Sequence, residues 1–327
     1  MVNKKIIMGI VLSCTLAVST GCSEKASQNY LSSSEHIKQE INDDSTTNQD
    51  DKQENGIMDE FNTIIERDAR LDEIISFVNK NISFLSKENG SIMVNKLEEL
   101  QKKNLKKLEN KFYGSDTLQN KMYKIYSSDL GIKIENVDDN ELKALLQETM
   151  DNGYKVESAE GMFFPIIDYE FYKKYSSYIT PDIKDYIHIM EIESNEAPAK
   201  DAALVIEWGE VLKRALRQEK FINGYPDSGK INDVKELYKK YIRFTLFGLN
   251  NTPLFSYDSK VMVEDARGIY NKAIESNEGS KLIITLKDFI EILEKNNYRL
   301  TDKSKKYRED VLESIFETDI EAITSLN

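Results

Sequence analysis

Apolar residues recur at intervals of three, four or seven along much of the chain, which is the spacing of helices with one buried face. The pattern predicts helices over 57–85, 91–113 and 115–126, with Ser91 as the cap of the second. In the first of these the apolar positions are Ile57, Phe61, Ile64, Leu71, Ile75, Val78, Ile82 and Leu85. No proline occurs before Pro165. We therefore expect a run of antiparallel helices joined by short turns, the layout of a bundle.

Helical spacing also covers most of the second half of the chain. The starts of these segments carry capping signals, such as Thr180-Pro181-Asp182, which places proline in the first turn. The expected helices span 138–152, 180–197, 199–223, 227–248, 259–275, 280–296 and 302–324. The predicted fold class is all-α or mainly α. It would be an antiparallel helical bundle or a stack of helical hairpins, with a short extended aromatic-rich segment near 153–168.

That aromatic-rich segment differs from the rest of the chain. Tyr154 and Val156 alternate with polar residues, and Glu160-Gly161 is a turn signal, so we expect an extended or hairpin-like passage. As the least helical stretch, it is the place where a groove is most expected. The candidate ligand-binding residues are Glu160, Phe163, Phe164, Asp168, Tyr169 and Trp208.

Acidic and aromatic side chains interleave from Glu157 to Glu210, and three interpretations remain open. A pair of carboxylates could hydrolyse a glycosidic bond, one as acid and the other as base or nucleophile. Rings and carboxylates could instead bind a sugar or a cation by stacking and charge. The third interpretation is an aromatic core beneath a solvated acidic surface. The lysines of 102–111 alternate with acids such as Glu98 and Glu109, which is typical of a solvated helix face.

The first residues have the layout of a secretory signal. Lys4 and Lys5 precede an apolar run over 6–18, and small residues at 19–21 lead to Cys22. The run is shorter than the roughly 20 residues that a membrane-spanning helix needs. Small residues directly before a cysteine resemble the lipobox of bacterial lipoproteins. The resemblance implies diacylglyceryl transfer to the Cys22 sulfur, cleavage before it and acylation of the new amino terminus.

The lipoprotein resemblance also implies a location: the cell membrane, lipid-anchored, facing the extracytoplasmic side. More than one acyl chain is needed for stable anchoring, which fits this type of modification. An ordinary cleaved signal peptide and an uncleaved N-terminal anchor are the alternatives. Residues 22–56 are polar and acidic, and we expect a disordered tether there. The expected organisation is a signal peptide over 1–21, this tether, a helical region over 57–152 and a second helical region over 153–327.

A weak internal repeat relates the segment ending at Ser228 to the one ending at Ser280. The phrase Phe221-x-x-x-Tyr225-Pro226-x-Ser228 resembles the inter-repeat turn of tetratricopeptide-like envelope lipoproteins. The resemblance covers 199–297 and implies helical hairpins that stack into a concave protein-binding surface. A well-capped helix–turn–helix would look the same.

Composition narrows the partners and the chemistry. The chain of 327 residues has a net charge of −13, which disfavours nucleic acid and anionic lipid. Both cysteines lie in the first 22 residues, and the only histidines are His36 and His188. Disulfides, histidine triads and multi-histidine metal sites are therefore not expected in the mature domain. No phosphate-binding or metal-binding motif is present, so we predict no cofactor and no metal site.

The sequence thus predicts a lipid-anchored binding or scaffolding module of the bacterial cell envelope. The lipid on Cys22 would hold it at the membrane, and an envelope protein is the expected partner. The alternative is a carboxylate-based hydrolase acting on cell-wall or glycan material.

Overall fold

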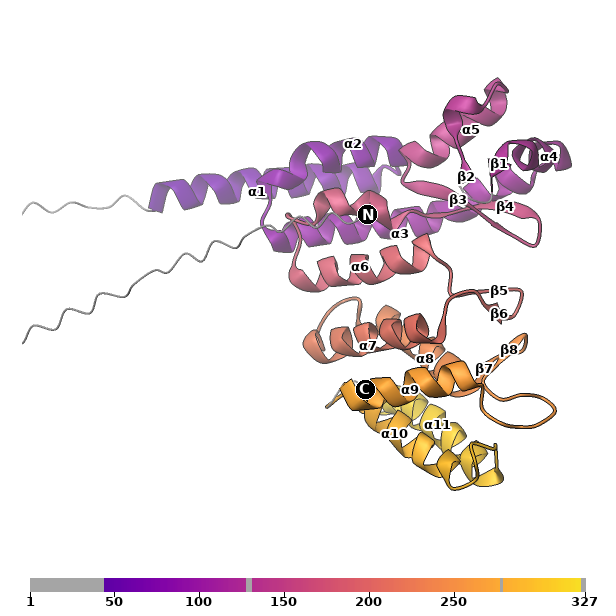
Figure 1. The fold of residues 1–327 in the computed structure, drawn as a ribbon. Helices are drawn as coiled ribbons and strands as arrows, with labels where there is room; N and C mark the ends of the chain where they lie inside the picture. Colours follow the sequence, from indigo (N-terminus) through magenta and orange to yellow (C-terminus); the bar gives the residue numbers. More distant parts are fainter. Residues whose placement is uncertain (1–43, 128–130, 277–278, 325–327) are drawn as a thin grey trace, which may run out of the picture. The chain divides into compact units, whose positions relative to one another are not determined.

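The computed structural model describes residues 44–127, 131–276 and 279–324, which form mainly helices (Figure 1). The helices are α1 (Asp44–Glu66), α2 (Leu71–Asn81), α3 (Lys87–Tyr113), α4 (Asp116–Ile125), α5 (Asn140–Asp151), α6 (Pro181–Asn195), α7 (Trp208–Gly224), α8 (Ile231–Phe247), α9 (Glu264–Ser276), α10 (Lys281–Glu294) and α11 (Asp302–Thr324). The predicted mainly α fold class is confirmed. None of the helices in these ranges is long and apolar enough to cross a membrane. The predicted signal peptide, Cys22 and the tether up to residue 43 lie outside the described residues.

Short elements lie between the helices. The antiparallel strand pairs are β1 (Tyr126–Ser127) with β2 (Gly131–Ile132), β3 (Tyr154–Ala159) with β4 (Met162–Ile167), β5 (Ala199–Lys200) with β6 (Ala203–Leu204), and β7 (Gly248–Leu249) with β8 (Thr252–Pro253). The 3-10 helices are η1 (Ile82–Phe84), η2 (Ile134–Asn136) and η3 (Tyr169–Tyr175).

The N-terminal helices differ from the prediction: the single helix expected over 57–85 is divided into the end of α1, helix α2 and η1. Helix α1 already begins at Asp44, so the tether extends less far than the expected Gly56. A tertiary contact supports the early turns of α1: the Glu54 carboxylate accepts hydrogen bonds from Ser86 and Asn89 at the start of α3. Ser86 is therefore the cap of α3. The predicted cap, Ser91, is buried, and its hydroxyl accepts a hydrogen bond from the backbone N–H of Thr180.

The expected hairpin is present, and its turn lies where the sequence places it. Strands β3 and β4 pair from Tyr154 opposite Ile167 to Ala159 opposite Met162. Glu160 and Gly161 both have positive φ, 50° and 75°, as a two-residue hairpin turn of type I′ requires.

Segment 199–207 is not the helix that its spacing predicts. It forms the β5–β6 hairpin, with positive φ at Asp201 and Ala202, and helix α7 begins at Trp208. Groups from far along the chain hold this hairpin. The Asn251 backbone N–H donates to the carbonyl of Ala202, and the Asn251 side chain donates to that of Asp201. These long-range bonds compete successfully with local helix propensity, which is a weak preference.

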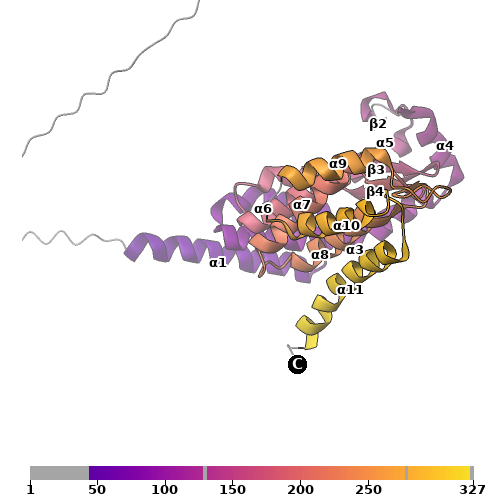
Figure 2. The ribbon, with the colours of Figure 1, turned by 60° about the horizontal axis from the view of Figure 1, so that its bottom comes forward.

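Two hydrophobic clusters form the interior. The first joins α1–α6 with the β3–β4 hairpin, and its most buried members are Val78, Met93, Leu97, Phe112 and Met122. The second joins α7–α11, and its most buried members include Val211, Tyr241, Leu246, Phe289 and Leu293. Helix α10 packs against both α9 and α11, and Figure 2 shows it between them. The β3–β4 hairpin and α6 pack with the preceding helices, and the two clusters meet at α7 and α8.

Helices α7 and α8 link the two clusters. Phe221 of α7 and Val234 of α8 belong to the first cluster, whereas most buried residues of these helices belong to the second. The two turns that suggested a repeat both end one helix and precede the next. Ser280 caps α10 through its hydroxyl, which accepts from the Ile283 N–H, whereas the cap of α8 is Lys230 rather than Ser228. The resemblance to tetratricopeptide-like lipoproteins stays a prediction.

Candidate functional site

The structure does not bring the predicted ligand-binding residues together on one surface. Glu160 is exposed at the hairpin turn, and Phe163 and Tyr169 are buried in the first cluster. Phe164 is half-buried on the other face of β4, since neighbours in a strand point to opposite sides. Trp208 packs in the second cluster, edge-on against Tyr270. These aromatic residues therefore serve mainly as core, one of the three interpretations that the sequence left open.

The two carboxylates predicted for the groove lie at opposite ends of the hairpin. Glu160 is at the turn, whereas Asp168 follows β4 at the base, where its N–H donates to the carbonyl of Gly153. A strand of this length separates them by about 20 Å, at roughly 3.3 Å per residue. Acid pairs of glycoside hydrolases stand about 5 to 9.5 Å apart. Asp168 instead caps η3 and lies 3.5 Å from the Lys155 ammonium.

A buried ion cluster lies where α3 meets α6 and the start of α8. Glu98 of α3 is only 3% exposed, in contrast to the solvated helix face expected for this stretch. Its carboxylate lies 2.6 Å from the Lys230 ammonium and 2.9 Å from that of Lys102. It also accepts hydrogen bonds from the hydroxyls of Tyr169 and Tyr186. Every oxygen of the buried carboxylate thus has a partner.

The Glu98 carboxylate stays charged at neutral pH and is not a proton donor. Burial by itself raises the pKa of Glu98, but the Lys230 ammonium and the hydrogen bonds from Lys230, Tyr169 and Tyr186 outweigh burial and lower that pKa to about 2. Burial, together with the nearby Glu98 charge, raises the pKa of Tyr169 and that of Tyr186, so both phenols keep their protons and donate. Because a general acid needs a pKa near the working pH, Glu98 is suited to holding helices together and not to acid catalysis.

A second ion cluster surrounds Arg214, which is 2% exposed on α7. Its guanidinium lies 3.1 Å from the Glu210 carboxylate, 2.8 Å from that of Glu196 and 3.5 Å from that of Glu193. It also donates to the backbone carbonyl of Glu196, just after the end of α6. Glu193 in turn pairs with Lys240 of α8 at 3.2 Å. The cluster therefore joins α6, α7 and α8, next to the division between the two hydrophobic clusters.

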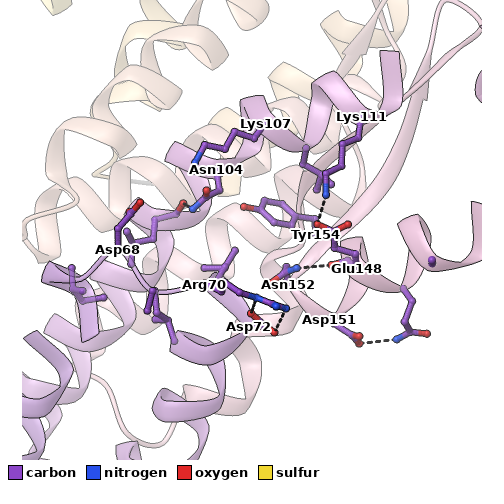
Figure 3. Close-up of a pocket in the computed structure, with 18 residues that line it drawn as sticks. Asp68, Arg70, Asp72, Asn104, Lys107, Lys111, Glu148, Asp151, Asn152 and Tyr154 are labelled. Atoms are coloured by element: carbon purple, nitrogen blue, oxygen red, sulfur yellow. Dashed lines mark hydrogen bonds and ion pairs between the residues drawn. The ribbon is translucent and has the colours of Figure 1, made fainter. Parts of the chain in front are cut away.

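The pocket of the first helical cluster is the best candidate for a ligand site (Figure 3). This first pocket has a volume of about 710 Å³ and lies between the α1–α2 connection, α3, α5 and the start of β3. Its apolar lining residues are Ile65, Ala69, Leu71, Ile74, Leu100, Leu108 and Ala144. Its size is within the range of about 300 to 1,000 Å³ that is typical of ligand pockets.

Charges of both signs surround the apolar part of the first pocket. Arg70 pairs with Asp72 at 2.7 Å, and Lys111 of α3 pairs with Glu148 of α5 at 2.5 Å. Lys107 has no carboxylate within ion-pair distance among the described side chains, although it lines the same pocket. The exposed Asp151 carboxylate contacts the Gln147 amide, not a cation. Cationic and anionic groups are thus both open to a ligand at the rim.

Neutral polar groups lie deeper in the first pocket. The Tyr154 ring lies between Asn104 of α3 and Arg70 (Figure 3). Burial raises the pKa of Tyr154, and its hydroxyl donates to the backbone carbonyl of Gln101 at 2.8 Å. The Asn152 amide nitrogen donates to the carbonyl of Glu148, but its side-chain oxygen is closed to solvent and has no hydrogen-bond partner. Buried polar atoms are normally paired, so this oxygen is an exception.

Sequence reasoning missed this pocket because its walls come from separate parts of the chain. The lysines of 102–111 were one available signal, because a lysine-rich stretch can bind an anion as well as form a solvated helix face. The contribution of Arg70, the residue before α2, and of Asp72 in its first turn had no local signal. Within the described residues no group of histidine, cysteine, aspartate and glutamate could hold a metal ion.

Comparisons with protein-family models, with curated proteins and with solved structures found no match for this chain.

Proposed function

We propose that this protein is an extracytoplasmic lipoprotein of the bacterial envelope, held at the membrane through Cys22, and that its helical part is a binding module. The N-terminal layout of basic, apolar and small residues before Cys22 supports the anchor. The first pocket supports the binding module, because it combines an apolar interior with charges of both signs at the rim.

The ligand class that best fits the first pocket is a peptide segment of an envelope protein. An apolar side chain of such a segment would fill the space between Leu71, Leu100 and Ala144. A peptide also carries charged groups that can pair with Lys107 and Asp151 at the rim. The single observation that carries the proposal is the pairing of an apolar interior with charges of both signs at the rim, Lys107 and Asp151, that form no ion pair with a described residue.

We expect Cys22→Ala to release the protein from membranes without unfolding it, because the lipid is the only anchor proposed. The measurement is the fraction of protein in the membrane pellet after cell fractionation. Cys14→Ala is the matched control, since it removes the other cysteine and should leave the protein in the pellet. If both variants stay in the pellet, Met1–Cys22 is an uncleaved anchor. If Cys14→Ala releases the protein instead, the lipid is on Cys14.

We expect Ala144→Trp to abolish partner capture at the first pocket. Ala144 is exposed on α5 and lines the pocket, so an indole there would occupy the space of the proposed apolar side chain. The measurement is chemical cross-linking of purified protein to partners in an envelope extract. Lys143→Trp is the matched control, because this neighbouring residue is exposed but does not line the pocket.

The expected result is a cross-linked peptide-bearing species that wild type and Lys143→Trp capture equally. Ala144→Trp should reduce its yield at least about tenfold, the effect of losing one well-packed anchor side chain. Thermal unfolding of the variants checks that both remain folded. Equal capture by Ala144→Trp would contradict the binding role of this pocket, whatever the outcome of the Cys22 experiment.

A further inference from the structure

A second pocket, remote in sequence from the first, lies in the C-terminal helical cluster. It has a volume of about 400 Å³ and is formed by the end of α8, the β7–β8 hairpin, the loop after it and α11. The charged residues that line it are Arg243, Lys260 and Arg308, and no carboxylate among the described residues lines it. This lining is cationic although the chain carries a net charge of −13. The contrast indicates a local preference for anions.

Arg308 is the most unusual residue of this second pocket. Its guanidinium carbon lies 4.1 Å from the centre of the Phe247 ring and 5.7 Å from that of Phe255. No described carboxylate lies within ion-pair distance of the guanidinium. Its one hydrogen bond to a described residue is a long one, 3.5 Å to the carbonyl of Leu246. Its Nε atom is closed to solvent and has no partner among the described residues. Burial lowers the pKa of Arg308. The nearby Glu309 charge offsets the cost of burying this cation only in part, and an anion in the pocket would offset it further.

Two further cations and an open aromatic ring lie at the mouth of the second pocket. Arg243 and Lys260 are exposed, and neither forms an ion pair with a described carboxylate. The Tyr257 ring, 61% exposed, lines the pocket, and the Lys260 ammonium lies 6.0 Å from its centre. Lys260 has a φ of 56°, a costly backbone conformation for a side-chain-bearing residue. This conformation belongs to a turn in which the Lys260 N–H donates to the carbonyl of Ser256.

We propose that this second pocket binds a small organic anion that carries a flat ring. The acidic group, a carboxylate or a phosphate, would pair with Arg308 and with the mobile ends of Lys260 and Arg243. The ring would pack against Phe247 and Tyr257, since packed aromatic rings attract each other by more than the burial of their surface alone contributes. The volume suits a ligand near the small end of the usual range.

Isothermal titration of the full-length protein in detergent tests this proposal with four probes: benzoate, phenyl phosphate, inorganic phosphate and the uncharged benzyl alcohol. We expect at least one aryl anion to bind with a Kd of about 1 mM or below, and at least about tenfold more tightly than benzyl alcohol. Phenyl phosphate should bind more tightly than inorganic phosphate because the ring contributes. Whichever aryl anion binds more tightly identifies the acidic group. If neither binds more tightly than benzyl alcohol, the proposal is wrong.

Variants locate the binding. Arg308→Gln should raise the Kd of the aryl anion at least about tenfold, the effect of losing a charge-assisted hydrogen bond. Lys260→Gln should raise the Kd of the aryl anion about threefold. Because Lys260 is exposed, this variant keeps the test decisive if Arg308→Gln does not fold. Lys305→Gln, on α11 outside the pocket, and Ala144→Trp, at the first pocket, should leave binding unchanged. If Lys260→Gln and every folded Arg308 variant bind as wild type does, the anion is not held in this pocket.

Discussion

Replacing Lys230 with methionine is expected to lower the free energy of unfolding by about 3 kcal/mol, at the low end of the cost of unpairing a buried charge. The change removes the ammonium that lies 2.6 Å from the Glu98 carboxylate, which is 3% exposed. The carboxylate then keeps Lys102, at 2.9 Å, and its phenol donors. Lys102 is half-exposed and compensates only in part, which is why we expect a value at the low end. Urea unfolding at neutral pH, followed by circular dichroism, measures the loss.

Two further variants separate the buried charge from a simple loss of packing. The double variant Glu98→Gln/Lys230→Met leaves no charge unpaired between these positions, and we expect it to recover more than half of the loss. Lys305→Met is the matched control, since it breaks an exposed pair with Asp302 on α11. It should change stability by about 0.5 kcal/mol or less. A loss below about 1 kcal/mol for Lys230→Met would show that Lys230 does not hold the Glu98 charge.

Acid should destabilise the fold through the same cluster. The pKa of Glu98 is about 2 in the folded protein, against an ordinary value of 4.5. Because the folded-state pKa is the lower one, the carboxylate contributes stability above pH 4.5, and this contribution is lost as the pH falls toward 2. At about 1.4 kcal/mol per pKa unit, we expect about 2 kcal/mol of it to be lost between pH 6 and pH 3.

Many carboxylates titrate in this range, so the measurement is a difference between proteins. We expect the stability advantage of wild type over Glu98→Gln to shrink by about 2 kcal/mol from pH 6 to pH 3. Glu99→Gln is the matched control, because Glu99 is the next residue along α3 and its side chain is 60% exposed. Its difference from wild type should change much less. If wild type were more stable than Glu98→Gln by the same amount at all pH values, Glu98 would not be a carboxylate whose pKa is lowered by folding.

Local features of this chain could be predicted well. Ser115 caps α4 and Asp139 caps α5, both at helix starts that the sequence indicates. Asn152 ends α5, and Glu160-Gly161 turns the hairpin. These features depend on residues within a few positions of each other, through side-chain hydrogen bonds to nearby N–H groups and through the backbone preferences of single residues.

Long-range features could not be predicted in the same way. Glu98 looked like part of a solvated face, because its sequence neighbours are lysines and acids. Its partner Lys230 lies 132 positions away. Segment 199–207 has a helical pattern, yet it forms a hairpin in which the Ala202 carbonyl accepts from the Asn251 N–H and the Leu204 N–H donates to the Thr252 hydroxyl. The expected groove failed for a related reason: Phe163 and Tyr169 face one core, and Trp208 faces the other.

The sequence by itself determined the mainly α class, most helix ends and the hairpin turn, because periodicity and capping are properties of neighbouring residues. It also carries the signal on which the proposed Cys22 anchor rests. Only the tertiary structure decided which polar residues are buried and which segments enclose a pocket. The ion clusters of Glu98 and Arg214 and both pockets arise from contacts between distant segments. Such contacts are fixed by the packing of whole helices, and no short stretch of sequence specifies them.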